Sequence, residues 1–159
     1  MLFFIFFDYH IAENRKIWQT YIVPLTQEQF VQKVDYSVGS IRNHVVHMMS
    51  VDDTWFCGLQ GADIPNQLNP VHFAKRDKIR GYWDEIENRM QIYLDLLTDE
   101  MLFDKPFDFE EDENLIVWQV LLHIVNHGTD HRAQLLRLLN DIGVDTKSQD
   151  YIFYVYDNL

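Results

Sequence analysis

The sequence predicts an all-α protein, a four-helix bundle that forms a single domain over residues 1–159. Three observations lead to this prediction. Apolar residues recur at helical spacing through four long segments, and the breaks between these segments fall at intervals that suit helices. Glycine and proline are few, with 6 and 4 residues respectively. Hydrophobic residues make up 47% of the chain, which is enough for one domain of this length to bury a full core.

The first two helices are predicted over residues 3–22 and from Ser40 to the region 58–61. Pro24 ends the first of them. Residues 1–7 are apolar but lack the basic leader and the cleavage site of a signal peptide, so we interpret them as the buried first turns of this helix. Ser40 belongs to the residue types that favour the N-cap position, which places the start of the second helix.

The third helix is predicted to open with Asn69 and Pro70, a cap followed by a first-turn proline. Its apolar residues show the clearest helical period: Ile79, Trp83, Ile86, Met90, Tyr93 and Leu97. The fourth helix is predicted from Leu115 to Ile142, and Gly143 is its natural end. The aromatic tail, residues 150–156, is either a short fifth helix or an extended cover on the bundle.

Charge and cysteine content exclude several classes of function. The formal net charge is -12 and the isoelectric point is near 4.8, so nucleic acids and anionic membrane surfaces would be repelled, and we expect neither as a partner. No apolar run reaches the roughly 20 residues that span a bilayer. Cys57 is the only cysteine, which rules out an intramolecular disulfide and a multi-thiolate zinc site. We therefore expect a cytoplasmic protein and place Cys57 in the core.

Three histidines of the fourth helix, His123, His127 and His131, recur every four residues and therefore share one face. Side chains four apart lie about 5–6 Å from one another at Cβ, so two such imidazoles can reach one metal ion. His123 and His131 are separated by about 12 Å along the axis, too far for one ion. The residues alone leave two pairs open, His123 with His127 and His127 with His131.

A third ligand has to come from another helix, and the second helix offers His44 and His47 near its apolar stripe. His47, flanked by Met48 and Val51, is the better candidate. The simpler alternative is that these are buried histidines that only form hydrogen bonds. Several acids, Asp52, Asp53 and Asp130, lie near the candidate ligands in sequence, and we expect each to be a solvated surface residue. His10 and His72 receive no role.

The same histidines lack the residues of two other metal-site patterns. The zinc-protease motif is absent because no glutamate follows His123 or His127, and the Glu-x-x-His spacing of carboxylate-bridged di-iron bundles is absent as well. A hemerythrin-like di-iron site remains an alternative, since His127 and His131 are four apart and His47 and Asp52 are five apart. The His-x-x-x-Glu that would complete it is missing.

Two segments resemble a known family. The segment from Trp118 to Gln134, followed by Leu138, Leu139 and Gly143, resembles the last helix of DinB-like (DinB/YfiT) proteins; His127, His131 and Arg132 carry this match. The segment from Ser40 to Trp55 resembles the second helix of the same family, in which a histidine precedes a tryptophan-bearing turn. On that pattern His47 is a ligand and His44 is not, so the resemblance implies a metal site of His47, His127 and His131.

The resemblance also implies an up-down-down-up bundle with a short C-terminal extension, commonly a homodimer. Parallel second and third helices need a long connection, which residues 61–69 can just provide at about 3.3 Å each. Three histidines on a divalent cation leave open positions for water; zinc or nickel is the first choice, and iron, copper or manganese would also suit. The implied activity is that of a metal-dependent S-transferase joining a small-molecule thiol to an electrophile. The alternative is a non-catalytic, metal-dependent small-molecule binding or stress-response protein.

Overall fold

The computed structural model describes the backbone of residues 2–159 and the side chains of residues 4–159. Its helices are α1 (Leu2–Ile17), α2 (Gln27–Val31), α3 (Ile41–Leu59), α4 (Arg76–Leu96), α5 (Val117–Asp141) and α6 (Tyr151–Asp157). Shorter helical turns lie at Trp18–Ile22, Pro70–His72 and Met101–Phe103. This described part of the chain contains no β-strand, which confirms the all-α prediction.

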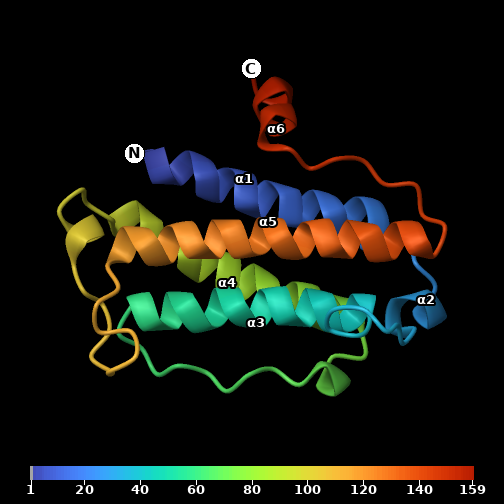
Figure 1. Ribbon diagram of the computed structural model, residues 1–159, viewed down its shortest axis with the longest axis horizontal. Coiled ribbons are helices and arrows are strands. Elements are labelled where there is room, and N and C mark those ends of the chain that lie inside the picture. The colour runs from blue at the N-terminus through green and yellow to red at the C-terminus, as the bar shows by residue number, and fades with distance from the viewer. Residues whose placement is uncertain (1) are drawn as a thin grey trace.

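The four long helices form a bundle in which α1 and α5 run in one direction and α3 and α4 run in the other (Figure 1). This confirms the up-down-down-up order. Helix α3 packs against α4 and α5, and α5 also packs against α1. The link between the parallel helices α3 and α4 returns along the whole length of α3 (Figure 1). None of the helices described within residues 2–159 is both long and apolar enough to cross a lipid bilayer.

The predicted first helix is confirmed, although its last turn is wider than expected. Helix α1 continues directly into the π-helical turn Trp18–Ile22, which closes with a hydrogen bond of 3.0 Å from the Val23 N–H to the Trp18 carbonyl. The expected burial of the first turns is confirmed for Phe7 but is wrong for Ile5, whose side chain is exposed. The predicted burial of the side chains of residues 1–3 lies outside the described residues.

Helix α2 is absent from the sequence prediction, although its start carries a recognisable signal. The Thr26 hydroxyl accepts a hydrogen bond from the Gln29 N–H (3.2 Å), and the Gln29 side chain accepts one from the Thr26 N–H (2.9 Å). This reciprocal pair is a capping box, in which a threonine is followed three residues later by a glutamine. The helix is only one turn and a half long, too short for an apolar period to identify it.

The predicted start of α3 and the predicted C-terminal ends of α3 and α5 are confirmed, whereas α5 starts at Val117, two residues after the predicted Leu115. The Ser40 hydroxyl accepts from the Asn43 N–H (3.1 Å) at the start of α3. Gly61 after α3 and Gly143 after α5 have φ values of +64° and +86°, which favour glycine. After α5, Val144 donates to the Leu139 carbonyl at 3.0 Å, the long bond of a Schellman motif.

The predicted start of the third long helix at Asn69 and Pro70 is wrong. The Asn69 side chain does act as a cap, accepting from the Val71 N–H at 3.0 Å, but it caps the short 3-10 turn Pro70–His72. Helix α4 begins only at Arg76. The chain leaves the helical conformation at Phe73, whose ring is buried and packs on Tyr82 with 6.0 Å between ring centroids. Burial of Phe73 thus overrides a local signal for helix initiation.

The aromatic tail forms the short helix α6, which settles the choice left open by the sequence. Its side chains pack on α1: the ring centroids of Tyr9 and Tyr151 are 5.2 Å apart, and those of Tyr9 and Tyr154 are 5.5 Å apart. Phe6 of α1 also contacts Tyr151, at 5.7 Å. Helix α6 therefore covers the outer side of α1 (Figure 1).

The hydrophobic core draws on all four long helices, and His10 of α1 packs directly over the backbone of Gly128 on α5. A Cβ atom placed on Gly128 would lie 2.4 Å from Cε1 of His10 and 2.6 Å from its Nδ1. His10 is itself buried and cannot swing away. The absence of a side chain at Gly128 is therefore what allows α1 and α5 to pack at this distance.

We expect Gly128→Ala to lower the free energy of unfolding by about 1–3 kcal/mol, because the added methyl group overpacks the contact with His10. Gly81 is the matched control: it lies on the exposed side of α4, where a Cβ atom would meet nothing within 4 Å. Gly81→Ala should raise the free energy of unfolding by up to about 1 kcal/mol, from helix propensity alone. Urea denaturation measures both, and equal effects at the two positions would contradict the close-packing explanation.

Candidate metal centre

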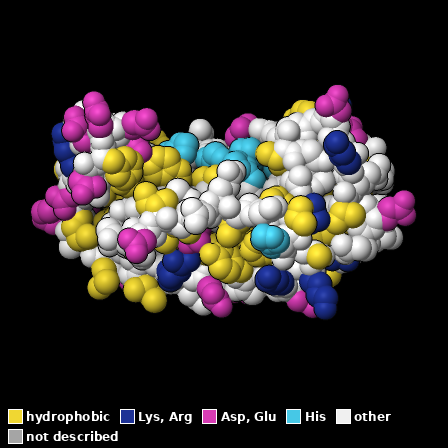
Figure 2. Space-filling model, turned by 90° about the horizontal axis from the view of Figure 1, so that it is seen from below, with side chains coloured by type: hydrophobic (Ala, Val, Ile, Leu, Met, Phe, Trp, Pro, Cys, Tyr) yellow, Lys and Arg dark blue, Asp and Glu magenta, His cyan; other side chains and the backbone are white. Residues whose placement is uncertain are grey.

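The structure brings together His47 from α3 and His127 and His131 from α5. One ring nitrogen of each lies within 4.8 Å of those of the other two. The ring centroids are 4.3 Å apart for His127 and His131, 4.5 Å for His47 and His131, and 5.3 Å for His47 and His127. All three side chains are half-buried. Figure 2 shows histidine side chains gathered on one face of the molecule, beside hydrophobic ones.

The cluster has the spacing and the chemistry that a divalent ion requires. The Nε2 atoms of His47 and His131 are 3.2 Å apart, close to the roughly 3.3 Å that separates two nitrogens bound at 2.0–2.1 Å in a tetrahedral site. Imidazole nitrogens suit zinc, nickel, copper and iron alike. Three histidines therefore lie close enough to hold a metal ion. The binding of an ion by these residues stays a prediction.

Burial keeps these imidazoles neutral near pH 7, so that their lone pairs are available. Burial lowers the pKa of His47. Burial also lowers the pKa of His131, and the neighbouring His47 lowers it further. For His127 burial and the adjacent His131 and His47 lower the pKa to about 4. Each effect has the same cause, because a buried site surrounded by other imidazoles disfavours an additional positive charge.

His44, one turn before His47, is fully buried and contacts His131 on the side of the cluster that faces the core. Its Nε2 atom lies 3.2 Å from Nδ1 of His131, and burial lowers its pKa to about 4. Among the described residues its own Nδ1 atom has no hydrogen-bond partner. As the family resemblance implies, His44 is not one of the three clustered residues, but it is directly connected to one of them.

His123, the other histidine of the repeat, does not join the cluster. Its ring centroid is 5.7 Å from that of His127, and its exposed side chain packs edge-on against Trp55 at 5.0 Å. Of the two pairs that the sequence left open, the structure therefore clusters His127 with His131. The predicted helical spacing explains why His123 cannot belong to the same group as His131.

The prediction that the neighbouring acids are solvated holds for Asp130 but is wrong for Asp52 and Asp53, which are both 2% exposed. The Asp52 carboxylate accepts from His10 Nε2 and from Trp83 Nε1, both at 3.3 Å. It is not part of the histidine cluster. The structure thus gives no support to the hemerythrin-like alternative, which depended on Asp52. Periodicity could not have shown that α1 and α4 supply partners for this carboxylate.

Arg132 is a fully buried cation next to His131, and it organises a network that the sequence did not reveal. It donates to the side chains of Gln149 (2.6 Å), Asn14 (3.0 Å), Thr129 (3.0 Å) and His10 (3.3 Å). A guanidinium has no acceptor, so Nδ1 of His10 accepts from Arg132, while Nε2 of His10 lies 3.3 Å from Oδ2 of Asp52 and 3.2 Å from Nδ2 of Asn14. The His10 imidazole thereby links the buried guanidinium to a buried carboxylate.

Cys57 lies in a separate buried cluster on α3 and α4. Asp53 accepts from the Tyr82 hydroxyl (2.9 Å) and pairs with Arg89, which also donates to the Cys57 sulfur (3.4 Å). Burial raises the pKa of the Cys57 thiol, and Asp53 raises it further. A buried thiol with a raised pKa is a poor nucleophile, in agreement with the expectation that Cys57 is a core residue.

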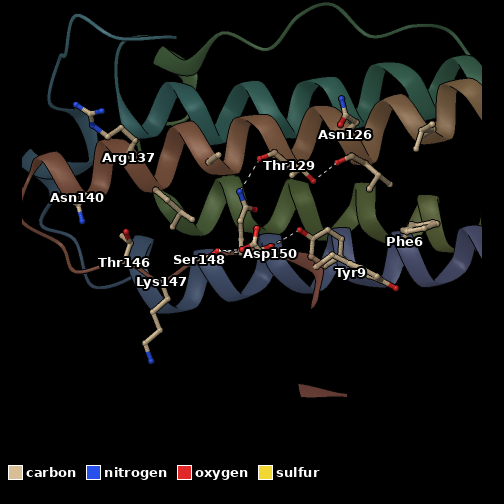
Figure 3. A pocket seen from close by; sticks show the side chains of 16 residues that line it. Phe6, Tyr9, Asn126, Thr129, Arg137, Asn140, Thr146, Lys147, Ser148 and Asp150 are labelled. Carbon is tan, nitrogen blue, oxygen red and sulfur yellow. Dashed lines mark hydrogen bonds between the residues drawn. The ribbon is translucent and has the colours of Figure 1, made fainter. Parts of the chain in front are cut away.

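A cavity of about 710 Å³ lies between α1, α5 and the segment before α6 (Figure 3). Its lining includes Phe6 and Tyr9 from α1, Thr129 and Arg137 from α5, and Ser148 from the segment before α6. None of the residues that line it is a histidine. It therefore lies apart from the candidate metal centre.

We expect the metal-free protein to lose stability as the pH falls from about 6.5 towards 4. An unfolded histidine has a pKa near 6.5, whereas His44 and His127 have pKa values of about 4 in the folded state. Between these values the unfolded chain binds protons that the folded chain does not. Stability is therefore highest above about pH 6.5 and decreases on acidification through this window.

Urea denaturation of chelator-treated protein at about pH 7.5, 5.5 and 4.5 tests this expectation. The double variant His44→Gln/His127→Gln is the control, since it removes the two groups and keeps the carboxylates that also titrate in acid. Its stability should change less between pH 7.5 and 5.5 than that of the unaltered protein. The same pH dependence in both proteins would contradict the assignment.

Two comparisons with known proteins agree with this architecture. A family model described as the DinB family matches residues 6–158, which include most of α1, all of α3, α4 and α5, and the three clustered histidines. Protein DinB of Bacillus subtilis (strain 168) is 25% identical to this chain over 161 residues. That alignment covers 94% of this chain and 91% of the Bacillus protein. The similarity therefore extends over nearly the whole bundle.

Proposed function

The chain belongs to the DinB family, and we propose that it is a metal-dependent enzyme in which His47, His127 and His131 hold one divalent cation, zinc or nickel by preference. The observation that carries this proposal is the convergence of three neutral imidazoles from two antiparallel helices within 4.8 Å. The proposed reaction is the transfer of a small-molecule thiol to a small electrophile. A homodimer and a cytoplasmic location are part of the same proposal, supported by the family membership and by the single free cysteine.

The protein's own contribution is to hold three rings in place while leaving one side accessible. Helices α3 and α5 pack along each other, so the rings project from rigid elements. All three side chains keep partial exposure, which gives a small molecule access. Three neutral ligands leave a bound divalent ion its full charge and an open position, with which it lowers the pKa of a coordinated thiol or water.

In the proposed transfer, the thiol sulfur forms a bond with the electrophilic carbon, and the leaving group departs with the electrons of its own bond. The proton of the thiol passes to solvent. We assign no side chain as a general base, because Asp52 and Asp53 are engaged in buried hydrogen bonds. The partial exposure of the histidine cluster is consistent with proton release to water.

The metal content of untagged protein tests the site. Elemental analysis should find about one equivalent of a divalent metal in the unaltered protein and a loss of that equivalent in His47→Ala, His127→Ala and His131→Ala. His123→Ala is the matched control, because His123 lies on the same helix but outside the cluster and should keep the metal. A protein that remains metal-free after divalent ions are supplied would refute the proposal.

Turnover tests the reaction. The metal-loaded protein should accelerate the coupling of a low-molecular-weight thiol to a chromogenic halonitrobenzene, and chelation or His127→Ala should return the rate to that of the uncatalysed reaction. A thiol that raises the melting temperature of the metal-loaded protein without any turnover would instead identify the protein as a metal-dependent binding protein. The two readouts therefore separate the enzymatic function from the non-catalytic alternative.

A further inference from the structure

Three imidazoles form a continuous row that leads from the metal centre into the core. Nε2 of His47 lies 3.2 Å from Nε2 of His131, and Nδ1 of His131 lies 3.2 Å from Nε2 of His44. His131 therefore presents one ring nitrogen to the candidate metal site and the other to His44. His44 is fully buried. Among the described residues, its Nε2 atom is the hydrogen-bond partner of Nδ1 of His131.

The protonation of this row is determined by which nitrogen binds the ion. If Nε2 of His131 is a ligand beside Nε2 of His47, its lone pair is committed, and a neutral ring then carries its proton on Nδ1. That N–H points to Nε2 of His44, which has to accept it. Histidine ligands of metals are generally oriented by such a hydrogen bond from the second ring nitrogen.

We propose that His44 is a positioning residue of the metal centre, which fixes the tautomer and the ring orientation of His131 by accepting the hydrogen bond from its Nδ1–H. The inference rests on the proposed function, because it presupposes that His131 binds a metal ion. The inference goes beyond the proposed ligands, because His44 is not one of them.

The unpartnered nitrogen of His44 supports a role other than packing. Its Nδ1 atom is buried and has no hydrogen-bond partner among the described residues. An apolar residue of similar size would fill the same space without leaving a polar atom unsatisfied. The lack of a competing bond at Nδ1 also lets His44 take either tautomer. It can donate to His131 in the metal-free protein and accept from it when His131 is a ligand.

Paired substitutions at His44 separate the hydrogen bond from the packing. His44→Gln keeps a side-chain oxygen able to accept from His131, whereas His44→Leu fills the space and removes the acceptor. We expect His44→Leu to bind Zn²⁺ about 10–100-fold more weakly than the unaltered protein in a competition with a chromogenic chelator. His44→Gln should restore most of that affinity. His123→Leu, outside the row, should leave it unchanged.

A second readout does not depend on how well a variant folds. In the Zn²⁺-loaded unaltered protein, long-range ¹H–¹⁵N NMR spectra should show His131 protonated on Nδ1 and ligated through Nε2. Ligation through Nδ1, or equal Zn²⁺ affinity of His44→Leu and the unaltered protein, would overturn the inference while the three-histidine site stands. If the unaltered protein binds no Zn²⁺, the proposed function fails, and the inference fails with it.

Discussion

The close packing of α5 against its neighbours is the constraint on which the rest of the structure depends. Helix α5 contacts α3 on one side and α1 on another. At Gly128 the contact with α1 leaves no room for a side chain, because His10 occupies that space. One turn further along α5, His131 faces α3 and His47. The same packing thus sets both the spacing of the helices and the geometry of the histidine cluster.

Two consecutive residues of α5, His131 and Arg132, lie in two different environments. His131 belongs to a group of neutral imidazoles, whereas Arg132 is a buried cation that ties together α1, α5 and the segment before α6. A guanidinium close to a divalent ion would be repelled by it. Arg132 is instead connected through His10 to the carboxylate of Asp52, which lies on α3. Opposite charges are therefore paired across the helix interface, and the candidate metal site keeps an uncharged set of donors.

Much of the fold was predictable, because most of its signals are local. The apolar period placed the four long helices, and the caps at Ser40 and Gly143 appear in the structure as the hydrogen bonds that those residue types favour. The prediction failed where the burial of a side chain prevailed over a local signal. Asn69 and Pro70 resemble a helix start, but the burial of Phe73 delays α4 to Arg76.

The sequence by itself determined which histidines share a face of α5, because the rise and the turn of an α-helix fix spacing within one element. It also determined that no multi-thiolate site could form, and the family resemblance singled out His47, His127 and His131. Only the tertiary structure decided that His44 contacts His131 and that His10 links Arg132 to a carboxylate. These outcomes depend on the distance and the register between helices, which side-chain packing sets and which no periodicity within a single segment records.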